Sequence, residues 1–308
     1  MRRLTRAVLT LVALLPVAVA CSSGEVGQSP TSAPTTSPTV ANTVTLEVDG
    51  RPFQLYVPSS YDEATPAPLV VGLHGYTSHS AELESYFKLA PQAEQRGFLY
   101  ALPDGTTDRR GDRFWNATNA CCDLFGSGVD DSTYLSNLIE RVKESYSVDA
   151  DRVFFVGHSN GGYMSHRMAC EHADQITAIA SLAGVLWADP ARCRPSRPVS
   201  VLQIHGTADE TVRYGGGVFS GARDYPGAEE TVAQWRELNG CSDVADTSTP
   251  PKDLDDAVRE AETVVTVYTG CRDGSRVELW SMEGSFHVPR LNDSFAPAVL
   301  DFLFESAD

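Results

Sequence analysis

Five short, almost uninterrupted apolar runs constrain the fold of this chain more than any other feature. They alternate along the sequence with segments whose apolar residues recur at helical spacing. A strand that is apolar throughout must be covered on both faces, as happens in a parallel sheet flanked by helices. We therefore predict an α/β fold with a doubly wound, mostly parallel sheet. The strands are expected at residues 69–73, 98–102, 153–156, 176–182 and 199–204, and the helices at residues 81–96, 132–146, 161–172 and 228–238.

The start of the folded region has a different pattern. Residues 43–48 and 53–57 alternate between polar and apolar side chains on either side of Asp49-Gly50, which is a typical hairpin turn. The sequence therefore predicts an N-terminal antiparallel hairpin at one edge of the sheet.

One of the apolar runs leads directly into a reactive-looking turn. Residues 153–156 are followed by Gly157-His158-Ser159-Asn160-Gly161 and then by the predicted helix. A serine at such a strand-to-helix elbow stands clear of the sheet, and the flanking glycines leave room for the sharp turn. The pattern predicts Ser159 as a nucleophile, and the alternative is a glycine-rich packing turn.

A serine hydroxyl needs an imidazole to take its proton and a carboxylate to orient that imidazole. In doubly wound folds with such an elbow, these groups follow the serine in the order acid, then histidine, each after a strand. Asp209 follows the run at 199–204, and His287 follows a β-like run at 277–282. We predict Asp209 as the acid and His287 as the base. Glu210 is the alternative acid, and an Asx turn is the alternative role for Asp209.

The remaining histidines after the elbow are given structural roles. His205 leaves the strand itself and precedes the acid, so it is predicted to be structural. His166 and His172 lie on the helix that begins at the elbow, and both are predicted to be partly solvated.

Acyl transfer also requires N–H donors for the developing oxyanion. The backbone N–H of Asn160, first in the elbow helix, is one candidate. The second is the backbone N–H of Tyr76, because His74-Gly75-Tyr76 follows the apolar run at 69–73. The alternative for this segment is an ordinary turn at the end of a strand.

These segments together carry a resemblance to a known family. Leu73-His74-Gly75, Gly157-His158-Ser159-Asn160-Gly161-Gly162, His205-Gly206-Thr207-Ala208-Asp209 and His287 resemble the polyhydroxybutyrate depolymerase and feruloyl esterase family of α/β-hydrolases, over about residues 43–306. The exported lipoprotein branch is most similar, since it adds an aromatic and cysteine-containing segment like residues 115–122. The resemblance implies Ser159 as nucleophile, Asp209 as acid and His287 as base. The chain departs from many members after the histidine, where Val288-Pro289-Arg290 replaces Trp-Pro-Gly.

The N-terminus has the pattern of an export signal. Residues 1–20 combine three arginines with an apolar run and precede Cys21, which predicts a lipoprotein signal peptide with Cys21 as the lipidation site. The alternative is simple secretion. Residues 21–41 are rich in Ser, Thr and Pro and are predicted to be a tether, leaving 42–308 as one hydrolase domain. The expected location is the outer face of the cell membrane, with anchoring by lipid or release outside the cell.

Six cysteines remain after Cys21, and an even number in an exported chain predicts disulfides. We pair Cys241 with Cys271 and Cys170 with Cys193, which leaves Cys121 and Cys122. A bond between sequence neighbours is strained, so the alternatives for this pair are free thiols or exchange with another pair. The sequence has no metal-ligand spacing, so no metal or cofactor is predicted.

Charge narrows the choice of partners. The formal net charge of −17 argues against nucleic acid, because phosphate binding requires clustered cations. The acidic segment 243–262, which contains Pro250-Pro251, is predicted to be a solvated loop.

An ester with a bulky acyl group needs an apolar platform beside the nucleophile. Phe114, Trp115 and Phe286 are the predicted substrate contacts, together with Tyr76, and loop packing is the alternative for Phe114 and Trp115. The expected function is an exported serine esterase acting on polysaccharide-linked feruloyl or acetyl esters, or on short polyhydroxyalkanoate esters. The alternative is a non-catalytic surface lipoprotein that binds a ligand with the same fold. Triad chemistry does not choose among esters, because they differ in the pocket shape they need.

Overall fold

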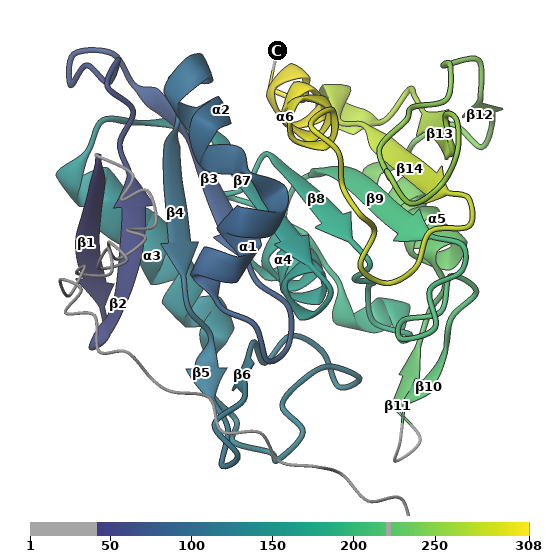
Figure 1. The fold of residues 1–308 in the computed structure, drawn as a ribbon, viewed down its shortest axis with the longest axis horizontal. Helices are drawn as coiled ribbons and strands as arrows, with labels where there is room; N and C mark the ends of the chain where they lie inside the picture. Colours follow the sequence, from purple (N-terminus) through teal and green to yellow (C-terminus); the bar gives the residue numbers. More distant parts are fainter. Residues whose placement is uncertain (1–41, 220–222, 308) are drawn as a thin grey trace, which may run out of the picture. The chain divides into compact units, whose positions relative to one another are not determined.

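The computed structural model describes residues 42–219 and 223–307 (Figure 1). The predicted signal peptide, tether and lipidated Cys21 lie outside the described residues. The main sheet has ten strands in the order β1-β2-β4-β3-β7-β8-β9-β14-β13-β12. Their bounds are Thr43–Val48 (β1), Arg51–Tyr56 (β2), Ala67–Leu73 (β3), Leu99–Pro103 (β4), Val148–His158 (β7), Ala178–Leu182 (β8), Ser200–Gly206 (β9), Ala245–Asp246 (β12), Thr263–Tyr268 (β13) and Val277–Met282 (β14).

The centre of this sheet is parallel. Strands β4, β3, β7, β8, β9 and β14 pair in parallel, whereas β1, β2, β13 and β12 pair with their neighbours in antiparallel register. Every residue of β3, β8 and β9 is buried, as their apolar sequences require. The predicted mostly parallel α/β fold is confirmed.

Helices cover both faces of the sheet (Figure 1). The helices α3, α4 and α5 contribute to one buried apolar cluster, and α1, α2 and α6 contribute to the other. The helix bounds are Ser80–Phe87 (α1), Leu89–Arg96 (α2), Asp131–Ser145 (α3), Asn160–Glu171 (α4), Ala228–Asn239 (α5) and Phe295–Glu305 (α6). Two short two-stranded sheets, β5 (Thr106–Thr107) with β6 (Arg113–Phe114) and β10 (Gly217–Phe219) with β11 (Arg223–Tyr225), extend from the loops.

The N-terminal hairpin is present as predicted. Strands β1 and β2 pair in antiparallel register through the turn at Asp49-Gly50. Both turn residues have positive φ, 53° and 75°, which matches the twist of a two-residue hairpin.

The single helix predicted at residues 81–96 is wrong, because the structure contains two helices there. Lys88 adopts a left-handed conformation between α1 and α2. Pro91 explains the break, because a proline has no N–H and would clash with the carbonyl four residues earlier in a continuous helix. The Glu84 carboxylate accepts hydrogen bonds from the backbone N–H groups of Leu89 and Ala90, which start α2.

The prediction of a solvated loop at residues 243–262 is also wrong in part. Leu254, Asp255 and Glu262 are buried. Glu262 accepts hydrogen bonds from the backbone N–H of Leu254, and Lys252 forms a β-bridge with Thr263. The end of this acidic segment therefore packs against the sheet.

Three disulfides are present. Cys241 bonds to Cys271 and Cys170 bonds to Cys193, as paired from the sequence. Cys121 and Cys122 bond to each other, so these two cysteines are neither free nor exchanged with another pair.

Among the described helices, none is long and apolar enough to cross a membrane.

Candidate active site

The nucleophile elbow joins β7 to α4. Ser159 has φ 53° and ψ −118°, a strained conformation for a residue with a side chain. The surrounding packing leaves no room for side chains on the flanking glycines. A Cβ at Gly157 would lie 2.2 Å from the Gly161 carbonyl oxygen, and a Cβ at Gly161 would lie 2.0 Å from the Leu73 carbonyl oxygen. The two glycines thus let the turn close tightly enough to present Ser159.

The structure brings the three predicted triad residues together. His287 Nε2 lies 2.9 Å from Ser159 Oγ, and His287 Nδ1 lies 2.7 Å from Asp209 Oδ2. The three side chains come from the turn after β7, the loop after β9 and the loop after β14. Because β7, β8, β9 and β14 pair in parallel, the loops after them lie at the same edge of the sheet. This is the arrangement in which an imidazole can take the proton of a serine hydroxyl.

The loop after β9 orients the Asp209 carboxylate. Its Oδ1 accepts hydrogen bonds of 2.8 Å from the backbone N–H groups of Thr211 and Val212. Burial raises the pKa of Asp209, but the hydrogen bonds that it accepts from His205 and His287 outweigh burial and hold the pKa well below its usual range. Asp209 is therefore ionised in the folded protein near neutral pH.

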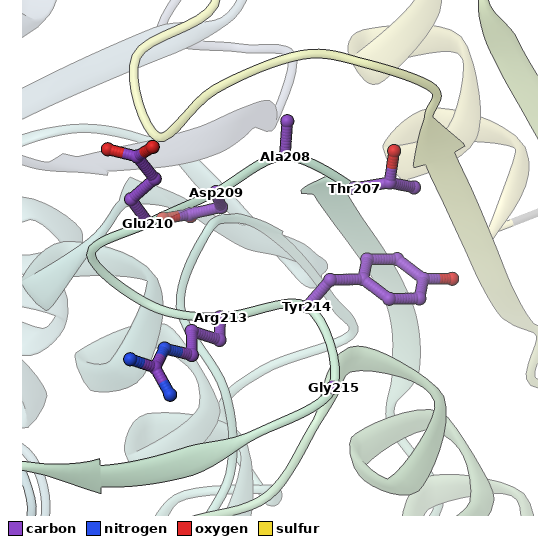
Figure 2. Close-up of a pocket in the computed structure, with 7 residues that line it drawn as sticks. All are labelled: Thr207, Ala208, Asp209, Glu210, Arg213, Tyr214 and Gly215. Carbon is purple, nitrogen blue, oxygen red and sulfur yellow. The ribbon is translucent and has the colours of Figure 1, made fainter.

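Glu210, the alternative acid, is exposed on the same loop. It lines an open pocket of about 610 Å³ together with Arg213 and Tyr214 (Figure 2). The carboxylate that is hydrogen-bonded to His287 is that of Asp209 and not that of Glu210.

A buried brace holds the loop that carries His287. Ser285 Oγ donates to Asp255 Oδ2 at 2.7 Å, and the backbone N–H of Arg290 donates to Asp255 Oδ1 at 2.9 Å. Asp255 thus binds the loop on both sides of His287. Asp255 was not predicted as part of the site, because the acidic character of its segment indicated a solvated loop.

A second contact reaches His287 from the elbow. His158 Nε2 lies 3.0 Å from the His287 carbonyl oxygen, so it donates to that oxygen. Burial lowers the pKa of His158 to about 4, so near neutral pH it is uncharged beside His287.

The two predicted oxyanion donors lie beside the nucleophile. Asn160 is the first residue of α4, where a backbone N–H has no acceptor within the helix. Its side chain is held by Trp115, whose N–H donates to Oδ1 at 2.7 Å and whose carbonyl accepts from Nδ2 at 2.9 Å. Tyr76 lines the cavity at Ser159, and a Cβ at the preceding Gly75 would lie 3.5 Å from the Ser159 Cβ.

His74 fixes the loop before Tyr76. Its Nε2 accepts from the Gly105 N–H at 2.9 Å, so its proton is on Nδ1, which donates to the Gly75 carbonyl at 2.7 Å. Burial lowers the pKa of His74, which favours this neutral form.

A cavity of about 380 Å³ opens at the nucleophile. Its lining includes Ser159 and His287, and its apolar and aromatic residues are Leu83, Tyr86, Val288 and Tyr76, which was predicted as a substrate contact. Leu83 and Tyr86 come from α1, on which the sequence gives only helical spacing. Nothing in their local pattern distinguishes them from ordinary core residues.

The structure corrects the predicted substrate contacts. Phe114 and Trp115 do not line this cavity but are buried, at 1% and 0% exposure, and Trp115 Nε1 donates to the His74 carbonyl. They pack the loop behind the candidate oxyanion hole, which is the alternative role given to them. Phe286 is 60% exposed next to His287 and is also absent from the cavity lining.

One of the other histidines differs from its predicted setting. His166 is completely buried rather than partly solvated, and burial lowers its pKa to about 4. His205, on β9, is also buried and lies 3.4 Å from Asp209 Oδ2. Among residues 42–219 and 223–307, no group of three or more His, Cys, Asp or Glu side chains is arranged to hold a metal ion.

Comparison with known proteins assigns the chain to a family. The family model named Esterase matches residues 49–255, which is more than half of the chain. The chain belongs to the Esterase family.

Several of the curated relatives of this chain bear the name feruloyl esterase. Feruloyl esterase B of Piromyces equi is 29% identical over 238 residues, which cover 75% of this chain and 41% of that protein. The chain thus spans less than half of that relative's length. Feruloyl esterase D of Neurospora crassa is 26% identical over 322 residues, covering 96% of this chain and 94% of that protein.

A solved structure shares the fold of this Esterase family member. The acetyl xylan esterase from Aspergillus awamori superposes with a TM-score of 0.60 at 17% identity, covering 85% of this chain and 98% of that one. This likeness confirms the predicted α/β-hydrolase fold.

Proposed function

We propose that this protein is an exported serine esterase that hydrolyses carboxylic esters through an acyl-enzyme on Ser159. The observation that carries the proposal is the continuous contact from Ser159 Oγ through His287 to Asp209, at 2.9 and 2.7 Å. Membership of the Esterase family supports the same reaction class.

In the proposed mechanism, Ser159 Oγ attacks the ester carbonyl while His287 Nε2 takes its proton. Asp209 holds the Nδ1–H of His287 and stabilises the imidazolium that forms. The backbone N–H groups of Tyr76 and Asn160 stabilise the oxyanion, and the imidazolium returns the proton to the leaving alcohol. Water then cleaves the acyl-enzyme by the same steps, with His287 again acting as base.

We infer that the substrates are feruloyl or acetyl esters carried by polysaccharides. The relatives and the structural neighbour bear the names of feruloyl and acetyl xylan esterases, which supports this class. The cavity of about 380 Å³ beside Ser159 has apolar side chains on α1 and after His287 that suit an acyl group.

The proposed export is supported by the disulfides. Three cysteine pairs are oxidised in the structure, and such bonds persist in oxidising compartments. Anchoring through Cys21 stays a prediction from the sequence.

The test is hydrolysis of short-chain nitrophenyl esters by the purified protein and by Ser159→Ala. We expect activity in the wild type and a loss of at least about a thousandfold in the variant. Ser165→Ala is the matched control, because Ser165 lies on the same helix and donates only to the Gly161 carbonyl. A Ser159→Ala protein with full activity, or a wild type that neither hydrolyses esters nor reacts with a fluorophosphonate, would overturn the proposal.

The substrate class is tested separately with methyl ferulate, acetylated xylan and hydroxybutyrate oligomers. We expect the first two to be hydrolysed faster than the third. A preference for the oligomers would reassign the substrate to polyhydroxyalkanoates and keep the mechanism.

A further inference from the structure

A chain of buried polar side chains runs from α5 to the triad acid. Trp235 Nε1 lies 3.0 Å from His166 Nδ1, and His166 Nε2 lies 2.9 Å from Gln203 Oε1. Gln203 Nε2 lies 3.2 Å from His205 Nδ1. Trp235, His166, Gln203 and His205 are all completely buried, so solvent does not compete for these contacts. This hydrogen-bonded network joins α4, the helix that follows Ser159, to β9, the strand that leads to Asp209.

Two groups at fixed positions set the direction of every hydrogen bond in this chain. An indole N–H can only donate, so His166 Nδ1 accepts from Trp235 and the proton of His166 is on Nε2. A carbonyl can only accept, and Gln203 Nε2 lies 2.8 Å from the Gly184 carbonyl, so the nitrogen of the Gln203 amide must face that side. The same nitrogen then donates to His205 Nδ1, and the Gln203 oxygen accepts from His166. The contacts with Trp235 and with the Gly184 carbonyl thus require the same orientation of the Gln203 amide. Because His205 Nδ1 then accepts a hydrogen bond, the proton of His205 is on Nε2.

The Nε2–H of His205 lies near two acceptors in the loop that carries Asp209. It lies 2.7 Å from the Val212 carbonyl oxygen and 3.4 Å from Asp209 Oδ2. Val212 in turn donates its own N–H to Asp209 Oδ1. His205 therefore contacts one oxygen of the acid directly and binds the carbonyl of Val212, the residue whose backbone N–H holds the other oxygen.

We propose that His205 is a positioning residue for Asp209, and that Trp235, His166 and Gln203 hold it as the neutral Nε2–H tautomer. A neutral His205 orients the carboxylate while leaving its charge to His287. This inference rests on the proposed function, because it assigns His205 a part in the same triad.

Protonation of His205 would break the chain. A proton on Nδ1 requires the Gln203 amide to turn, which would face its oxygen toward the Gly184 carbonyl. It would also set the amide N–H against the Nε2–H of His166. The titratable groups that face His205 are Asp209 and the ring of Tyr214, whose centroid is 5.8 Å away, with His287 beyond Asp209.

The first test reads the tautomers directly. In the full chain labelled with ¹⁵N-histidine, we expect His205 and His166 to give the neutral Nε2–H pattern near neutral pH. In Gln203→Leu, the ¹⁵N resonance of His205 Nδ1 should shift, because this nitrogen loses the hydrogen bond that it accepts from the Gln203 amide. A wild-type His205 that is protonated, or that carries its proton on Nδ1, would overturn the proposal. This reading needs no turnover, so it stands or fails independently of the Ser159→Ala result.

The second test separates positioning from packing by kinetics. His205→Phe keeps a ring but loses the donor, and we expect kcat to fall about tenfold with little change in KM, as for one lost hydrogen bond to a charged group. His205→Gln restores an N–H at the position of Nε2 and should recover kcat to within about threefold of the wild type.

The matched control is Tyr214→Phe. Tyr214 lies next to His205 but is not part of the hydrogen-bonded network, so this variant should keep kcat within about twofold. A His205→Phe protein with wild-type kcat, or a His205→Gln protein that folds and remains as impaired as His205→Phe, would contradict the proposal. If His205→Phe does not fold, the tautomers and the kcat of His205→Gln still decide.

Discussion

At the scale of single residues, Asp209 divides its oxygens between two tasks. Oδ1 accepts two backbone N–H groups, and Oδ2 accepts the His287 Nδ1–H. The backbone bonds fix the plane of the carboxylate, so its charge faces the imidazole. This geometry distinguishes Asp209 from its exposed neighbour Glu210 more sharply than sequence position does.

Asp209→Asn should keep the loop but lose the charge that holds the correct tautomer of His287. We expect kcat on nitrophenyl esters to fall by about 10³- to 10⁴-fold, the size of this exchange in a serine protease triad. Glu210→Gln should keep kcat within about twofold. The reverse order of effects would make Glu210 the acid.

Gly161 is needed for the elbow because of its surroundings. A Cβ there would lie 2.0 Å from the Leu73 carbonyl oxygen and 2.7 Å from that of His74. Gly161→Ala should lower the free energy of unfolding by about 3 kcal/mol, measured by urea denaturation. Gly215→Ala is the control, since no atom lies within 4 Å of its added Cβ, and it should change stability by less than about 0.5 kcal/mol. Equal stabilities for the two variants would contradict the steric explanation.

The sequence located Ser159, Asp209 and His287 because each follows an apolar strand in a fixed chain order. It could not locate the cavity wall, because an aromatic beside a catalytic loop has the same local pattern whether it faces substrate or core. Trp115 faces the core, and Tyr86, from an unremarkable helix, faces the cavity. His166 was misassigned for a related reason, since its burial depends on Trp235 from a distant helix.

At the scale of elements, the histidine loop depends on a segment far from it in sequence. Asp255 binds Ser285 and Arg290 on either side of His287 and forms a β-bridge with Leu291. Net charge and two prolines suggested solvent for this segment. Leu254 nevertheless packs in the core, and Asp255 accepts hydrogen bonds from Ser285 and Arg290, which lie near it only in the folded protein.

Asp255→Ala should leave the Ser285 hydroxyl and two backbone N–H groups without their acceptor. We expect the free energy of unfolding to fall by about 3 kcal/mol and kcat to fall about tenfold, because His287 loses its fixed position. Asp256→Ala, at the exposed neighbouring residue, should change neither by a measurable amount. A loss of stability with unchanged kcat would show that the brace does not position His287.

At the scale of the whole molecule, the parallel strands at the centre of the sheet lie close to the five apolar runs that predicted them, because a continuous apolar run is typical of a strand covered on both faces. The antiparallel strands β12 and β13 were not predicted. They pair at the far edge of the sheet, where β12 has only two residues and both of them are exposed. So short an element has no periodicity to detect.

Buried histidines should make stability depend on pH. Burial lowers the pKa of His166 to about 4, below the value of about 6.5 in an unfolded chain, so the unfolded state binds more protons between these values. Stability is therefore lost as pH falls from about 6.5 to 4. From pH 7 to pH 4.5 the wild type should lose about 2 kcal/mol more than His166→Gln, measured by denaturant unfolding.

Other groups act in this range, which is why the comparison is between two proteins. His158 adds a loss of the same sign, whereas Glu84 and Asp131, whose pKa values are raised by burial, oppose it. All three are shared by the wild type and the variant. Identical pH slopes would mean that His166 is not the group responsible.

The two edge strands of the ten-stranded sheet, β1 and β12, are poor sites for a second molecule to add a strand. At one end, β1 exposes Thr43, Thr45 and the charged Glu47 in alternation, and at the other end β12 offers two residues. Short or charged borders of this kind discourage intermolecular pairing. A protein released into dilute surroundings without chaperones would benefit, because partly unfolded copies would have few places at which to begin aggregating.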